Sequence, residues 1–87
     1  MLKGKTRSGF EYEVAPERLN NYELVEALAE VDSNPLLLPK VVNLLLGQDL
    51  KNKLADHLRD ESGMVPMDAV SDELAEIFTS GQQVKNS

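Results

Sequence analysis

The stretch LLLPKVVNLLLG, residues 36–47, is the most apolar part of this sequence and constrains its fold more than any other feature. The chain has 87 residues, enough for one domain, and a domain of that size buries only about 60 to 65% of the surface of its unfolded chain. A helix with leucine on all sides belongs at the centre of such a domain, wrapped by the other elements. Because that shell is thin, the run has two interpretations: it forms the core, or part of it faces outward as a surface for another protein.

The same run is not expected to cross a membrane. It is shorter than the roughly 20 residues needed to span a bilayer, and Pro39, Lys40 and Asn43 interrupt it. The chain begins MLKGKTRSG, with charges and glycine where a signal peptide needs an apolar stretch, and it has no cysteine. We therefore expect neither secretion nor membrane binding, and we place the protein in the cytoplasm.

The segment LKGKTRSGFEYEV, near the N-terminus, is typical of a β-hairpin. Its residues alternate with period two on both sides of a serine–glycine pair. A three-residue loop that ends at Gly9, where a left-handed residue is required, keeps the polar and apolar faces apart. This register predicts two opposite charged pairs, Lys5 with Glu11 and Lys3 with Glu13. An isolated hairpin is only marginally stable, so its apolar face is expected to pack on helices.

Helices are predicted after the hairpin, because apolar residues there recur every three to four positions. Asn20 or Asn21 caps the first helix, and Gly47 closes the second. Pro66 opens the last helix, which we keep continuous although Ser71 is an alternative N-cap. Four acidic residues of this last helix are expected on its solvent side: Asp68, Asp72, Glu73 and Glu76.

These elements predict an α+β fold in which an N-terminal two-stranded antiparallel hairpin packs on a small bundle of about four short helices. One globular domain is expected over residues 1–81, followed by a flexible C-terminal tail over residues 82–87. Within the domain, the hairpin is predicted over residues 2–14 and the helices over about 21–32, 38–46, 49–61 and 66–80.

Few residues are suited to catalysis. The 15 acidic and 9 basic residues give a net charge of −6, the wrong sign for neutralising phosphates, so nucleic-acid binding is not expected. The sequence has no phosphate-cradling glycine loop, nucleophile elbow or metal-ligand spacing. His57, the sole histidine, lies at the margin of an apolar stripe, where packing explains it better than general base catalysis. We predict a protein that is not an enzyme, with no cofactor and no catalytic, cofactor-binding or metal-binding residue.

Two features are candidates for contact with a protein partner. The first is the outward part of the apolar run. The second is a column of acidic residues at i, i+4 spacing, which is either an acidic ridge that attracts a basic partner or a solvated face. The predicted partner-binding residues are Leu36, Leu37, Leu38, Val41, Val42 and Leu45 for apolar contact, with Asp68, Asp72 and Glu76 as a charged rim.

The order LPK, NLLLG, HLRDE, G, VP, EIF, after an SGFEYEV hairpin and an ELVEALAEVD helix, resembles the small acidic tail assembly chaperones of long-tailed bacteriophages and prophages of Gram-positive hosts. The likeness covers residues 6–87, but the family offers no contact motif to assign residue by residue. It implies a non-enzymatic chaperone that binds the helical tape measure protein and keeps it soluble during tail morphogenesis. It also implies that the protein works in the host cytoplasm and is absent from the mature virion.

The resemblance further implies a longer product, made by ribosomal frameshifting, that recruits the tail tube protein. A homo-oligomer is compatible with this interpretation. The alternative is a small acidic regulator, or DNA mimic, that binds a basic DNA-binding protein through carboxylates spaced like phosphates. The two hypotheses differ in their response to salt, because screening weakens charge pairs far more than apolar contacts.

Overall fold

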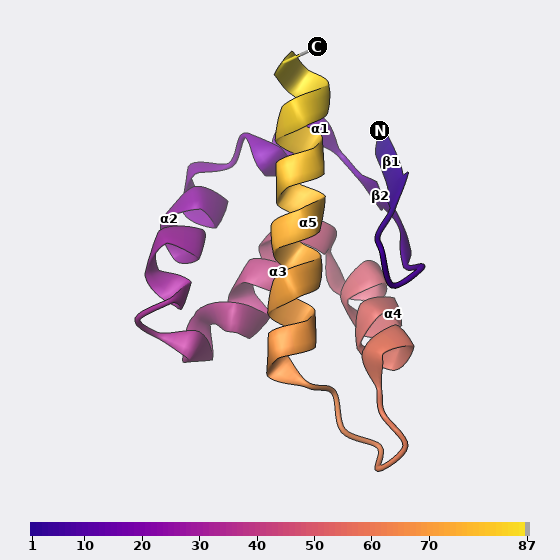
Figure 1. Cartoon of the computed structure of the whole chain (residues 1–87). Coiled ribbons are helices and arrows are strands. Elements are labelled where there is room, and N and C mark those ends of the chain that lie inside the picture. Colours follow the sequence, from indigo (N-terminus) through magenta and orange to yellow (C-terminus); the bar gives the residue numbers. More distant parts are fainter. Residues whose placement is uncertain (87) are drawn as a thin grey trace.

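A computed structural model of the chain describes the backbone of residues 1–86 and the side chains of residues 1–80. Within that part, an N-terminal antiparallel hairpin precedes a set of helices, as expected for the predicted α+β fold (Figure 1). The elements are β1 (Leu2–Lys5), β2 (Glu11–Val14), α1 (Pro16–Leu19), α2 (Tyr22–Val31), the 3₁₀ turn η1 (Pro35–Leu37), α3 (Leu38–Leu46), α4 (Gln48–Leu58) and α5 (Met67–Asn86).

The predicted register of the hairpin is confirmed. Lys5 lies opposite Glu11 and Lys3 opposite Glu13. The Gly9 N–H donates to the carbonyl oxygen of the residue that starts the turn at 2.9 Å, and the φ of Gly9 is 94°. The left-handed conformation required at this position is therefore present, and it favours glycine.

Two short elements were not predicted, α1 and η1. Each begins with a proline, Pro16 or Pro35, whose fixed φ suits the first turn of a helix. Both are too short to show a helical period in the sequence. Asn21, not Asn20, caps α2, because its side chain accepts a hydrogen bond from the Glu23 N–H at 3.0 Å.

The last two helices differ from the prediction in where they end. α4 ends at Leu58 instead of residue 61, because Arg59 has an extended backbone. α5 is continuous, without a restart at Ser71, and passes through Gly81 to Asn86. The last helix therefore extends beyond its predicted end at residue 80, since one glycine costs a helix only about 1 kcal/mol and need not end it. Ser87 lies outside the described residues.

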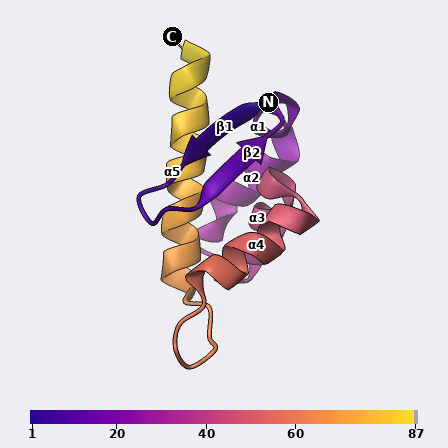
Figure 2. The same cartoon turned by 90° about the vertical axis from the view of Figure 1, so that its right-hand side faces the viewer.

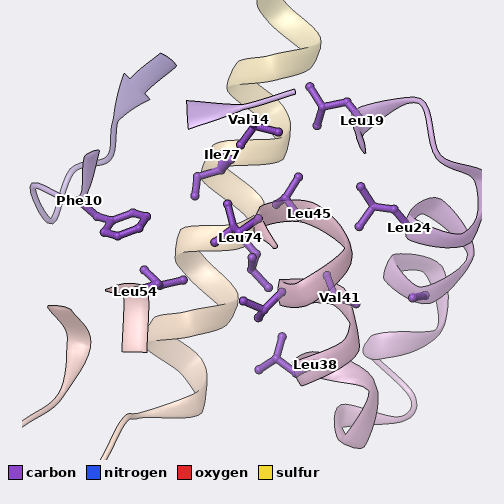
Figure 3. Close-up of a cluster of buried hydrophobic side chains, with 13 residues drawn as sticks. Phe10, Val14, Leu19, Leu24, Leu38, Val41, Leu45, Leu54, Leu74 and Ile77 are labelled. Carbon is purple, nitrogen blue, oxygen red and sulfur yellow. The ribbon is translucent and has the colours of Figure 1, made fainter. Parts of the chain in front are cut away.

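The central helix is α3, as the apolar run predicted. It contacts β2, α1, α2 and α4, and it contributes five buried side chains to the core. Figure 3 shows three of them, Leu38, Val41 and Leu45, among Leu74 and Ile77 of α5. No helix within residues 1–86 combines the length and the apolarity that crossing a membrane requires.

Candidate functional site

The structure places the six predicted apolar partner-binding residues in different environments. Four of them have at most 7% of their surface exposed and belong to the core: Leu38, Val41, Val42 and Leu45. Leu38 and Val42 also line a hollow at the surface, whereas Val41 and Leu45 do not. Leu37 is half-buried. Leu36, on the short η1 turn, is 87% exposed and is the one of the six that lies mostly in solvent.

Beside the start of α3 the structure has an apolar hollow of about 300 Å³. Its wall comes from the start of α3, the middle of α4 and the first turn of α5, and Lys51 is its single charged lining residue among residues 1–80. Met67 lies at its edge with 54% of its surface exposed. The residues that line this apolar hollow are Leu38, Pro39, Val42, Lys51, Leu54, Ala55, Val65, Met67 and Val70.

A second hollow, of about 290 Å³, adjoins the first. The two share Leu38 and Met67, so together they form one surface feature, here called the α3–α5 groove. We call the second part the acidic hollow, because three of its lining residues are carboxylates. Its lining residues are Val31, Asp32, Pro35, Leu38, Met67, Asp68, Ser71 and Asp72.

The predicted acidic column does not act as one unit. Asp68 and Asp72 line the acidic hollow, but Glu76 does not. The Glu76 Oε2 atom instead accepts a hydrogen bond from the Arg7 N–H at 3.0 Å, which ties it to the hairpin loop. Asp32, at the end of α2, takes the third place in the hollow and was missed. No pattern in the sequence links it to α5, because only the tertiary fold brings the two helices together.

The loop between α4 and α5 closes one side of the apolar hollow, to which it contributes Val65. Asp60 organises this loop. Its Oδ1 atom accepts hydrogen bonds from the Ser62 hydroxyl at 2.6 Å, the Ser62 N–H at 2.9 Å and the Met64 N–H at 3.0 Å. The Ser62 hydroxyl, followed by the backbone N–H groups, lowers the pKa of the Asp60 carboxyl below its ordinary value of 3.8.

Acid is expected to release this loop. The folded-state pKa of Asp60 lies below its value in the unfolded chain, so the carboxylate stabilises the fold above pH 3.8, and this contribution is lost as pH falls through the folded-state pKa. NMR spectra recorded against pH should show the Ser62 and Met64 amide signals moving together below pH 3.8. In Asp60→Asn the same signals should not titrate. An Asp60 carboxyl that titrates at or above 3.8 contradicts the assignment.

A polar cluster joins the hairpin loop to α4 and α5, and Figure 2 shows the hairpin lying beside both helices. Glu73, only 6% exposed, accepts hydrogen bonds on Oε1 from the Thr6 hydroxyl at 2.7 Å and the Ser8 hydroxyl at 2.9 Å. His57 Nε2 lies 3.1 Å from both the hydroxyl and the carbonyl oxygen of Ser8. The expected solvent position of Glu73 is therefore wrong.

Serine, histidine and glutamate side chains in contact are typical of a hydrolase active site. In such a site the histidine accepts the proton of the serine hydroxyl, and here the hydrogen bonds are arranged differently. The carbonyl oxygen of Ser8 can only accept, so a hydrogen bond between it and His57 Nε2 requires a proton on that nitrogen. In that tautomer the nitrogen donates and does not take the proton of the Ser8 hydroxyl, for which Glu73 is the acceptor. The cluster holds the hairpin loop in place, and the ring of His57 packs 5.6 Å from that of Phe10, centroid to centroid.

The α3–α5 groove is the remaining candidate. Its carboxylates do not converge as metal ligands, since no group of three or more His, Cys, Asp or Glu side chains among the described residues is arranged to hold an ion. An apolar hollow with exposed Met67 beside it and carboxylates at one end is suited to a segment of another polypeptide. No protein-family model, no curated protein and no solved structure matches the chain.

Proposed function

We propose that this protein is a tail assembly chaperone of the kind its sequence resembles, and that its α3–α5 groove covers apolar stripes of the helical tape measure protein. The observation that carries the proposal is the apolar hollow, with Met67, 54% exposed, at its edge. Leu36, 87% exposed, directly follows Pro35, which lines the acidic hollow. A long helical protein displays amphipathic stripes that aggregate in water, and a helix-in-groove contact removes them from solvent. Such a chaperone works in the host cytoplasm and is left out of the finished virion.

The exposed side chains also indicate how strong one contact is. Covering Leu36 contributes roughly 1.5 to 3 kcal/mol, and covering the exposed half of Met67 contributes about half as much. Association itself costs an estimated 4 kcal/mol or more, so a single copy binds weakly. Methionine adapts its shape to different neighbours, which suits a site that meets many similar helices. Several copies along one long chain then keep it soluble, and self-association of the chaperone strengthens binding by raising the effective concentration.

Removing the two exposed side chains is expected to abolish capture. A tape measure fragment is co-expressed with the wild-type protein or with the Leu36→Ser/Met67→Ser variant, and soluble complex is measured by size exclusion. The loss of apolar contact predicts at least about a tenfold fall in complex. Tyr22→Ser is the matched control, because Tyr22 is 75% exposed on α2 and lines neither hollow.

Two results count against the proposal. Undiminished capture by the double variant, with its fold shown intact by circular dichroism, places the contact elsewhere. A complex that dissociates at about 0.5 M salt favours the acidic regulator instead, because charge pairs are strongly screened there while apolar contacts persist. We expect the complex to survive that salt concentration.

A further inference from the structure

The two ends of the α3–α5 groove carry opposite charge. Lys51 lines the apolar hollow, whereas Asp32, Asp68 and Asp72 line the acidic hollow. The hollows meet at Leu38 and Met67. A segment bound across both hollows therefore lies near Lys51 of this protein at one end and near the three aspartates at the other. The groove therefore distinguishes the two ends of whatever occupies it.

Two of the three carboxylates in the acidic hollow, those of Asp32 and Asp72, receive little electrostatic stabilisation from the rest of the protein. Asp32 follows the last turn of α2, the end at which the helix dipole disfavours a negative charge. Asp72 lies one turn after Asp68, and like charges at i, i+4 repel. Among the described side chains, the one ion pair within 4.0 Å joins Arg59 and Asp56, so neither Asp32 nor Asp72 has a cationic partner there.

Asp68 is the exception, because its carboxylate accepts a hydrogen bond from the Ala69 N–H at 2.9 Å and lies in the first turn of α5, where the helix dipole favours it. The other two carboxylates are exposed, so a positive charge brought from outside can reach them and lower their electrostatic energy. A metal ion does not fit, because these carboxylates do not form a metal-holding group. A lysine or arginine on a long flexible side chain reaches separated carboxylates without needing them to converge.

We propose that the occupant of the groove is an amphipathic helix with lysine or arginine at one end of its apolar stripe. Two apolar residues three or four positions apart enter the two hollows on either side of Met67, and the basic residues extend over Asp32 and Asp72. The opposite end of the stripe, near Lys51, is neutral or acidic. This inference rests on the proposed function, and it adds the charge order of the partner segment.

The test uses synthetic helical peptides that share one leucine stripe and differ only at one end of it. That end carries two lysines, two glutamines or two glutamates, and each peptide contains one tryptophan. The protein has no tryptophan, so fluorescence reports the peptide alone. At about 0.05 M salt the lysine peptide is expected to bind about fivefold tighter than the glutamine peptide, and the glutamate peptide more weakly than both. The preference should shrink below about twofold at 0.5 M salt.

Charge reversal in the protein locates the effect. Asp72→Lys and Asp32→Lys should each remove the preference for lysine, and a cation at position 32 suits the end of α2, so this variant is expected to fold. Glu26→Lys is the matched control: it changes the net charge equally, is exposed on α2 and lines neither hollow. This control should keep the preference.

The outcomes separate this inference from the proposed function. Equal binding of the lysine and glutamine peptides overturns the charge order but leaves the apolar groove in place. Equal loss of preference in Glu26→Lys means that net charge, not the acidic hollow, attracts the peptide, and also overturns the inference. A lysine peptide without leucines that binds as tightly as the original overturns it too. Absence of binding by every leucine peptide contradicts the groove itself, and the proposed function with it.

Discussion

Replacing Leu45 with alanine is expected to lower the free energy of unfolding by about 3 kcal/mol. Leu45 has 0% of its surface exposed and lies on α3, the helix that the other elements surround. The substitution removes buried methyl groups and leaves a cavity that a close-packed core fills only in part. A domain of this length has a total stability of roughly 4 to 13 kcal/mol, so the loss is a large fraction of it. Urea denaturation followed by circular dichroism measures the change.

Leu36→Ala is the matched control, since it removes the same atoms from a residue that is 87% exposed. Its expected effect is within about 0.5 kcal/mol of zero. The contrast between Leu45 and Leu36 separates the part of the apolar run that builds the core from the part available to a partner. Equal destabilisation by the two substitutions means that Leu36 is covered in the folded protein, and the proposed contact surface loses its most exposed residue.

The hairpin and the central helix could be predicted because each has one physical solution. In the hairpin, only the register that pairs Lys5 with Glu11 keeps the two faces separate, and Gly9 is the residue that tolerates the turn. In α3, five of the nine residues are buried, and so wide an apolar face is compatible with few positions other than the centre of the domain. The hairpin register depends on residues close together in the sequence, and the position of α3 depends on burial alone.

The candidate site was harder to predict, because Leu36, Leu37 and Leu38 precede Pro39, where the segment is too short for a helical period to distinguish inner from outer positions. Only the structure separates Leu38, which is buried, from Leu36, which is exposed. The groove is built from parts distant in the chain, and Asp32 and Met67 meet there only after folding. The apolar stripe of α5 was visible in the sequence, but the exposure of Met67 at its start was not.

Glu73 carries the second large effect, because its carboxylate is buried and fastens the hairpin loop to α5. Glu73→Ala is expected to lower the free energy of unfolding by about 2 to 4 kcal/mol, since hydrogen bonds to a charged group contribute roughly 1.5 to 3 kcal/mol each. The Ser8 hydroxyl can turn to solvent, whereas that of Thr6, 5% exposed, loses its carboxylate acceptor and keeps only the Ser8 hydroxyl, 3.1 Å away. Glu73→Gln keeps a side chain of the same length with one acceptor oxygen, so it is expected to lower the free energy of unfolding by only about 1 kcal/mol. Urea denaturation again measures both.

A double-mutant cycle decides whether this loss comes from the hydrogen bond or from lost packing. Thr6→Val removes the buried hydroxyl that donates to Glu73 at 2.7 Å while keeping the side-chain volume. If the hydrogen bond is the cause, the double variant Thr6→Val/Glu73→Ala should be less destabilised than the sum of the single variants by about 1 to 2 kcal/mol, because each single change already breaks the same contact. Losses that add within about 0.3 to 0.5 kcal/mol show instead that the two side chains act independently, and that the hydrogen bond between Thr6 and Glu73 does not fix the hairpin on the helices.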